Sequence, residues 1–186
     1  TIPVISGLDT NEHPCQVLTD LMTIKENKGK LKGLNFVYLG DGANNMANSY
    51  LIGCAIAGMN VKIVSPKKYW PDDYYVSEAK KFGVNVEITD EVEDSTKNAD
   101  VVATDTWVSM GDEEEKEKRL KEFKGYTVND DLMNKADPDA IFIHCLPAYY
   151  GYEVTKEVAH GTQSVIFDEA ENRMWAQNAI MVTLLK

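Results

Sequence analysis

The sequence predicts an α/β fold: a doubly wound, mainly parallel sheet of about five to six strands with helices on both faces, in a Rossmann-like arrangement. Short β-rich runs alternate with helical stretches along most of the chain. Several of these runs are nearly continuously apolar, which is typical of parallel strands that are covered on both faces. Glycines near the ends of the helical stretches support the same alternation.

Six short runs are predicted to be strands, and the stretches around them to be helices. The predicted strands are 34–40, 61–65, 84–89, 101–108, 140–145 and 164–168. The predicted helices between them are 44–59, 71–83, 90–99, 112–123, 129–136 and 153–161. Two outer helices, 13–29 and 170–186, precede the first strand and follow the last.

The composition limits the classes of function. A chain of 186 residues fits one domain, and its net charge of −11 argues against a nucleic acid partner. The three cysteines, Cys15, Cys54 and Cys145, lie far apart, which favours a reducing, cytoplasmic location over a disulfide scaffold. No apolar segment is long enough to span a membrane, and the start lacks the pattern of a signal peptide.

The turn after the first predicted strand, GDGANNMANS, is a candidate ligand site. Gly40 and Gly42 permit a tight turn, and the helix amides that follow favour an anion. Asn45 occupies the place of the third glycine of a nucleotide-binding fingerprint. We therefore favour a small polar ligand, held by Asn45 and the turn, over a dinucleotide. A turn with an asparagine-rich helix start is the structural alternative.

The fourth predicted strand runs into TDTWVSMG. Asp105 is expected near the end of this strand, followed by a loop that contains Ser109 and Met110. A carboxylate together with free backbone groups can hold an ammonium group or a zwitterion. An ordinary helix-capping loop is the alternative.

The fifth predicted strand ends in HCLPAYY. The Leu-Pro bond favours a tight bend, with a cis peptide as one possibility. Cys145 needs a base to act as a nucleophile, but the side chain of its neighbour His144 is expected on the opposite face of the strand. A zinc site needs more thiols or histidines at regular spacing than the chain offers. Core packing and ligand contact stay open for Cys145.

Two further groups lie near the ends of the chain. FDEAENR places an acidic run before Arg173, and the alternative is a helix start capped by acids. EHPCQ places His13 and Gln16 about one helical turn apart, a spacing that is usually structural.

Taken together, HPCQ, GDGANNMANS, TDTWVSMG, HCLPA and FDEAENR resemble the aspartate/ornithine carbamoyltransferase family. The likeness covers nearly the whole chain, in order and at the family's spacing. The SMG of residues 109–111 is similar to the signature of the ornithine type. The resemblance implies the C-terminal, amino-acid-binding half of a two-domain enzyme.

For carbamoyl phosphate, the resemblance implies contacts from five residues. His13 and Gln16 match residues that hold the carbamoyl group, and His13 matches the one that polarises its carbonyl oxygen. Arg173 matches an arginine that contacts carbamoyl phosphate. Cys145 and Leu146 match the bend where a thiol and a backbone carbonyl approach the reacting groups.

For L-ornithine, the resemblance implies that Asn45, Asp105, Ser109 and Met110 bind the α-carboxylate and α-amino groups. It implies that Cys145 is a ligand contact beside the reacting amine, not a nucleophile. The catalytic residues are then His13, Asp105, Cys145 and Arg173.

The implied reaction transfers the carbamoyl group to the side-chain amine of L-ornithine and gives citrulline and phosphate. It needs no cofactor, no metal and no covalent enzyme intermediate. The implied partners are L-ornithine, carbamoyl phosphate, an N-terminal domain, and two further copies in a homo-trimer, with no nucleic acid and no membrane. Trp175 and Asn178 depart from the family, whose members commonly have His and Lys at these two positions.

The family's phosphate-binding Ser-x-Arg-Thr-Arg motif does not occur in this sequence. The resemblance therefore implies that residues 1–186 form a single ornithine-binding domain, and that the chain alone is inactive or nearly so. The start without Met suggests a processed product or an excised piece. In the intact family the outer helices contact the other domain, so we expect exposed apolar side chains at 179–185.

Three alternatives to this reading stay open. One is a non-catalytic module that binds an amino acid. The second is a carbamoyltransferase for another amine or amino acid. The third is a nucleotide-dependent oxidoreductase, suggested by the fold and the Gly40–Gly42 turn.

Overall fold

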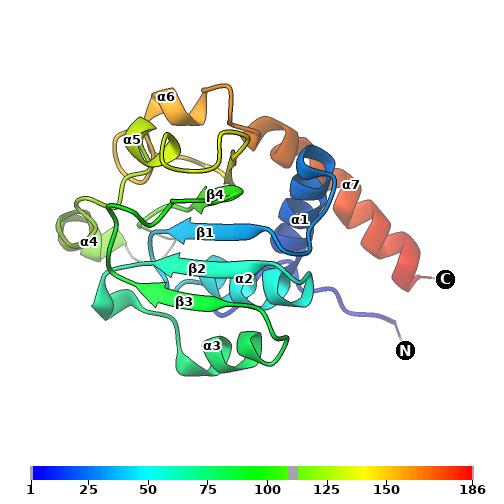
Figure 1. The fold of residues 1–186 in the computed structure, drawn as a ribbon. Helices are drawn as coiled ribbons and strands as arrows, with labels where there is room; N and C mark the ends of the chain where they lie inside the picture. Colours follow the sequence, from blue (N-terminus) through cyan, green and yellow to red (C-terminus); the bar gives the residue numbers. More distant parts are fainter. Residues whose placement is uncertain (1, 109–112, 186) are drawn as a thin grey trace.

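The computed structural model describes residues 2–108 and 113–185 (Figure 1). The predicted site residues Ser109 and Met110 lie outside the described residues. Along the chain, the helices and strands are α1 (Pro14–Lys28), β1 (Asn35–Leu39), α2 (Asn45–Ile56), β2 (Asn60–Val64), η1 (Lys67–Tyr69), α3 (Asp73–Lys80), β3 (Val86–Thr89), β4 (Val101–Thr104), η2 (Glu113–Glu115), α4 (Lys116–Glu122), α5 (Asp130–Met133), β5 (Ile141–His144), α6 (Lys156–Ala159) and α7 (Ile166–Leu184).

The described strands form one sheet in the order β3-β2-β1-β4-β5. All four strand pairs are parallel, with Phe36 of β1 opposite Val61 of β2 and opposite Val101 of β4. The chain runs outward from β1 to β3, crosses back to β4 on the other side of β1, and continues to β5. This confirms the predicted doubly wound parallel sheet, with five strands.

Helices cover both faces of the sheet because side chains alternate along each strand. Phe36 and Tyr38 face a core that α1, α2 and α3 complete. Val37 and Leu39 face a second core that α5, α6 and the start of α7 complete. These strands are apolar on both sides, which explains their nearly continuous hydrophobic sequence.

The segment 164–168, predicted as a sixth strand, is not a strand. Ser164 forms one isolated parallel bridge with Phe142 of β5, and α7 begins two residues later. A short apolar run fits the start of a buried helix as well as a strand. Asp168 and Glu169 fall in the first turn of α7, where acids suit the positive end of the helix dipole.

The segment 90–99, predicted as a helix, consists of turns instead. The Ser95 hydroxyl donates to the carbonyl of Val92 at 2.8 Å, and the Thr96 hydroxyl donates to the carbonyl of Leu132 at 2.7 Å. Hydroxyl side chains that bond backbone groups in this way compete with the helical hydrogen bonds.

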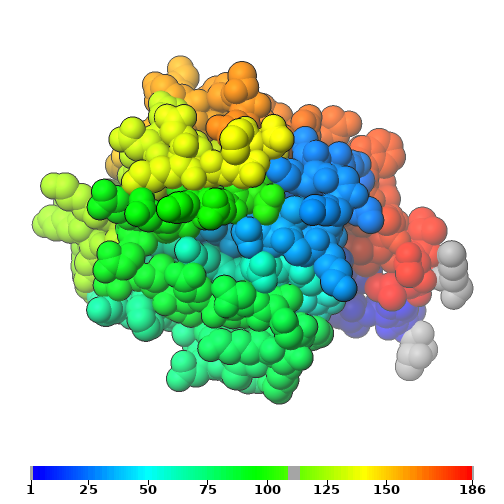
Figure 2. Space-filling model, in the orientation of Figure 1, coloured from blue at the N-terminus to red at the C-terminus, as the bar shows by residue number. Residues whose placement is uncertain are grey.

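The two outer helices, α1 and α7, pack side by side at one side of the molecule (Figure 1). The last turns of α7 lie beside the N-terminal segment, as the red and dark blue surfaces in Figure 2 show. Met181, Val182 and Leu185 on these turns are exposed, which agrees with the expectation for 179–185. Within the described residues, no helix combines the length and apolar character that crossing a membrane requires.

Candidate functional site

The sheet has its switch point between β1 and β4, where successive connections leave in opposite directions. In open α/β sheets, ligands bind outside the carboxyl ends of the strands at this point. Three polar side chains meet there: Asn44 follows β1, Asp105 follows β4, and Cys145 follows β5. β4 ends at Thr104, four residues before the predicted end of this strand.

Asp105 and Cys145 form the centre of this group. The Cys145 thiol donates to Oδ1 of Asp105, with Sγ 3.3 Å from the oxygen, and the Thr106 amide donates to the same oxygen at 2.7 Å. Burial and the charge of Asp105 raise the pKa of Cys145 well above its usual value. The sulfur is therefore a protonated thiol at neutral pH, which disfavours a nucleophile and suits a ligand contact.

Asn44 belongs to this group, although the sequence did not single it out. Its Oδ1 caps α2 by accepting from the Ala47 amide at 2.8 Å. Its Nδ2 lies 3.2 Å from the Tyr38 hydroxyl and 3.4 Å from Oδ2 of Asp105. The signal available in the sequence was an N-cap asparagine directly after a strand-ending turn.

Asn45, the predicted ligand residue, is the first residue of α2 and holds the N-terminal segment. Its Nδ2 donates to the carbonyl of Asp9 at 2.8 Å. One turn later, Nδ2 of Asn48 donates to the carbonyl of Asn11 at 3.0 Å. The contact of Asn45 with an ornithine ligand stays a prediction.

Gly42 is required by packing within the chain. A Cβ at this position would lie 2.7 Å from the carbonyl oxygen of Tyr69 and 3.0 Å from Cγ2 of Ile63. The Gly42 amide donates to the Ser65 hydroxyl at 3.1 Å. The space and the amide that a nucleotide phosphate would use are thus occupied by the protein, which disfavours a dinucleotide at the Gly40–Gly42 turn.

The bend after β5 is shaped by His144. Leu146 has a positive φ of 60°, and the Leu146–Pro147 peptide is cis. The Leu146 amide donates to Nδ1 of His144 at 2.9 Å, and Nε2 of His144 lies 3.3 Å from the Glu153 carboxylate. The proton of a neutral His144 is therefore on Nε2. Left-handed backbone in a bulky residue is strained and recurs at functional sites.

A second group joins the start of α1 to α7. Nη1 of Arg173 donates to Oε1 of Gln16, so the two residues lie together. Among the described residues, neither Nδ1 of His13 nor Nε of Arg173, both buried, has a hydrogen-bond partner. Burial, assisted by the charge of Arg173, lowers the pKa of His13, so its imidazole is neutral at neutral pH.

The Asp105, His144 and Cys145 side chains also have the residue types of a metal site. One potential ligand atom from each lies within 4.8 Å of the others. The thiol is protonated, and both His144 nitrogens already take part in hydrogen bonds. A metal ion would have to displace these interactions.

Arg119 ties the segment after β4 to the turn after β1. It donates to the carboxylate of Asp41 and to the carbonyl of Trp107, and its guanidinium lies 4.9 Å from the ring centre of Tyr69. Arg119 and Asp41 are both buried. This pair fixes the segment after β4, at Trp107, against the turn after β1.

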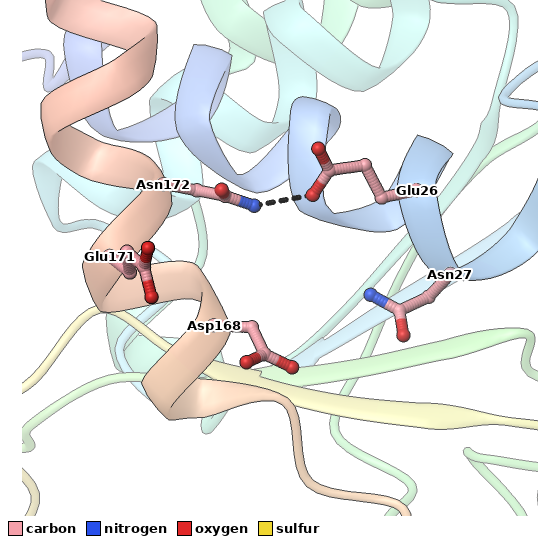
Figure 3. A pocket seen from close by; sticks show the side chains of 5 residues that line it. All are labelled: Glu26, Asn27, Asp168, Glu171 and Asn172. Atoms are coloured by element: carbon pink, nitrogen blue, oxygen red, sulfur yellow. Dashed lines mark hydrogen bonds between the residues drawn. The ribbon is translucent and has the colours of Figure 1, made fainter.

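One cavity is separate from these groups. It measures about 330 Å³ and lies between α1 and α7 (Figure 3). Its polar lining carries three carboxylates, and their negative charge does not suit a phosphate. The lining residues are Glu26, Asn27, Asp168, Glu171 and Asn172.

Comparison with known proteins identifies the family. A family model described as "Aspartate/ornithine carbamoyltransferase, Asp/Orn binding domain" matches residues 32–184. Ornithine carbamoyltransferase from Caldicellulosiruptor saccharolyticus is 53% identical over 98% of the chain, and the one from Methanosarcina mazei is 50% identical over 100%. The chain covers 60% and 61% of these two proteins, so it spans about three fifths of their length.

Solved structures give the same result. The ornithine carbamoyltransferase of Gloeobacter violaceus superposes with a TM-score of 0.91 at 41% identity, covering 100% of this chain and 63% of that one. The enzyme of Pyrococcus furiosus superposes with a TM-score of 0.91 at 45% identity, covering 97% of this chain and 59% of that one. The chain therefore belongs to the aspartate/ornithine carbamoyltransferase family and corresponds to its Asp/Orn-binding domain.

Proposed function

We propose that this chain is the ornithine-binding half of an ornithine carbamoyltransferase, which makes L-citrulline and phosphate from L-ornithine and carbamoyl phosphate. The observation that supports this most is the Asn44–Asp105–Cys145 group at the switch point, linked to the His13–Gln16–Arg173 group through Glu169, which accepts from Gln16 and from the His144 amide. The Asn44–Asp105–Cys145 group offers hydrogen-bond acceptors for the amino groups of an amino acid. The His13–Gln16–Arg173 group offers donors for a carbonyl oxygen and an anion.

On the amino-acid side, the buried carboxylate of Asp105 accepts from an ammonium or amine group of ornithine. The thiol of Cys145 and the carbonyl of Leu146 approach the side-chain amine and orient its lone pair. Asn45, Ser109 and Met110 complete the contacts to the α-carboxylate and α-amino groups in this proposal. Positioning of this kind supplies much of the rate when no covalent intermediate forms.

On the carbamoyl side, an N–H of the neutral His13 donates to the carbonyl oxygen, where negative charge develops. Arg173 contacts the anion, and Gln16 holds Arg173 and the carbamoyl amide. The amine lone pair forms the new C–N bond, and the C–O bond to phosphate breaks. The phosphate leaves with that electron pair, and the proton that the nitrogen loses passes to the departing phosphate.

The phosphate needs further cations. The chain has two arginines, and Arg119 is buried with Asp41. We infer that another domain provides the main phosphate contacts and that the exposed side chains of Met181, Val182 and Leu185 pack against it. Residues 1–186 then form one domain of the enzyme.

Assembly and location belong to the same proposal. We expect a homo-trimer of the intact enzyme, in the cytoplasm. Three free cysteines support a reducing compartment.

The test is a comparison of turnover with and without the additional domain. The chain would be assayed alone and joined to the part of the Pyrococcus furiosus enzyme that it does not cover. We expect citrulline only from the joined protein, with ornithine preferred over putrescine and aspartate. Absence of carbamoyl transfer by a folded joined protein, or equal turnover of all three acceptors, would contradict the proposal.

A further inference from the structure

Two carboxyl groups lie buried between α1 and α7. Asp20 of α1 and Glu169 of α7 are each 1% exposed. Nε2 of Gln16 donates to both, at 2.8 Å to Oδ1 of Asp20 and at 3.2 Å to Oε1 of Glu169. The two carboxyl groups therefore converge on one amide group, from helices far apart in the sequence.

No basic side chain in the described part of the protein forms a salt bridge with either carboxyl group. The nearby guanidinium of Arg173 donates to Oε1 of Gln16 instead. Two buried anions on one neutral amide repel each other and lose their hydration, which is costly without paired cations. The arrangement is stable when one of the carboxyl groups keeps a proton, as in other close carboxyl pairs.

The pKa shifts of the two carboxyl groups indicate which of them keeps the proton. Burial raises the pKa of Asp20 to about 6, and burial together with the charge of Asp20 raises the pKa of Glu169 well above its usual value. Glu169, whose pKa is also raised by the charge of Asp20, is then the group that keeps the proton, and Asp20 is the ionised one. The other titratable groups that face the pair are Arg173 of α7, Tyr50 and Cys54 of α2, and Asp105 and Cys145 at the ends of β4 and β5.

Each carboxyl group contacts a different part of the site. Asp20 accepts from Gln16, which in turn accepts from Arg173, so the position of the guanidinium depends on this carboxylate. Oε2 of Glu169 accepts from the His144 amide at 2.9 Å, one residue before Cys145. The pair thus lies between the predicted carbamoyl contacts and the thiol bend.

We propose that Asp20 and Glu169 hold one proton between them and act as a positioning pair, which orients Gln16 with Arg173 on one side and the His144 backbone on the other. The structural part of this inference concerns the chain alone. Its consequence for catalysis rests on the proposed carbamoyl transfer.

The proton is tested by infrared spectroscopy of the full chain at pH 7.5. We expect the carbonyl band of a protonated carboxylic acid, which is lost in Glu169→Gln and kept in Glu171→Gln, a matched change at an exposed position of the same helix. Circular dichroism confirms that each variant is folded. A spectrum without such a band, or a band that Glu169→Gln leaves unchanged, would overturn the shared proton.

The link to Gln16 is tested by the proton and nitrogen chemical shifts of its side-chain amide between pH 5 and pH 8. In the wild type we expect these shifts to titrate with a midpoint near the pKa of Asp20, about 6. In Asp20→Asn the titration should disappear. A Gln16 amide that does not titrate in the wild type, or that titrates equally in Asp20→Asn, contradicts the positioning role.

The catalytic consequence is measured on the chain joined to its complementary domain. In Asp20→Asn we expect the KM for carbamoyl phosphate to rise about 10-fold, because Gln16 loses a charged acceptor that holds Arg173 in place. The KM for ornithine should stay within about twofold, since Asp105 is unchanged. An equal rise in the KM for both substrates would contradict positioning through Gln16. If the joined wild type shows no turnover, the proposed function fails. The infrared and chemical-shift measurements still test whether Asp20 and Glu169 share a proton and orient Gln16.

Discussion

Sγ of Cys145 lies 3.3 Å from Oδ1 of Asp105 and donates a hydrogen bond to this oxygen. The carboxylate comes from the end of β4 and the thiol from the end of β5, the neighbouring strand. A thiol that donates to a carboxylate is neither a free nucleophile nor an inert core residue. In the proposed carbamoyl transfer, this contact lets the cysteine orient the substrate without forming a bond to it.

The first prediction concerns the reactivity of this thiol. Removing the negative charge in Asp105→Asn should lower the pKa of Cys145 and raise its rate of alkylation by iodoacetamide at pH 8. We expect a faster rate, since a lower pKa raises the thiolate fraction at this pH. Mass spectrometry locates the label, and Cys145→Ser is the control. An unchanged or slower rate in a folded Asp105→Asn variant would refute this electrostatic coupling.

The second prediction concerns the buried pair of Arg119 and Asp41. Arg119→Met leaves the carboxylate of Asp41 buried without this guanidinium, which should lower the free energy of unfolding by about 3–5 kcal/mol. Urea denaturation measures the change. The matched control is Lys118→Met, because Lys118 is exposed and pairs only at the surface with Glu115. Similar stability of the two variants would show that the pair does not fix this part of the fold.

The third prediction concerns the turn after β1. Gly42→Ala places a Cβ 2.7 Å from the carbonyl oxygen of Tyr69, which should destabilise the protein by about 1–3 kcal/mol through overpacking. Gly7→Ala is the control, because nothing lies within 4 Å of a Cβ there. Thermal unfolding of both variants distinguishes them. Equal melting temperatures would mean that the glycine is not needed for packing.

The fourth prediction concerns the dependence of stability on pH. The pKa of Asp20 is raised in the folded state to about 6, from its usual value of 3.8. Between these values the folded state holds more of this proton than the unfolded state, so the contribution of Asp20 to stability falls as the pH rises from about 4 to about 6. The raised pKa of Glu169 acts in the same direction. Asp20→Asn should flatten this slope in urea denaturation between pH 4 and pH 7, and an identical slope would contradict the assignment.

The sequence predicted the sheet because its strands are short, apolar on both sides and separated by helical stretches. It was wrong at 164–168, where a short apolar run begins a helix. It was also wrong at 90–99, where Ser95 and Thr96 bond backbone carbonyls in place of a helix. Both errors concern segments whose tertiary contacts, and not their local pattern, decide the structure.

The sequence also placed Asp105 and Cys145 near the ends of their strands and Gln16 near the start of its helix, where the structure has them. It placed Arg173 near the start of a helix 170–186, whereas Arg173 lies in the interior of α7, which begins at Ile166. It did not identify Asn44, because capping and ligand contact have the same local signature. The sequence does not predict the Asp20–Glu169 pair, since the two residues meet only when α1 and α7 pack together.

The proposed function depends most on Asp105, which we propose as the acceptor for ornithine. The decisive measurement is calorimetric titration of the joined two-domain protein with L-ornithine, in the wild type, in Asp105→Ala and in Asp131→Ala, a change at an exposed aspartate of α5. We predict binding to the wild type and to Asp131→Ala, and affinity at least about 100-fold lower in Asp105→Ala, since a buried charge-assisted contact is lost. Equal affinity of Asp105→Ala and the wild type for ornithine would contradict the account.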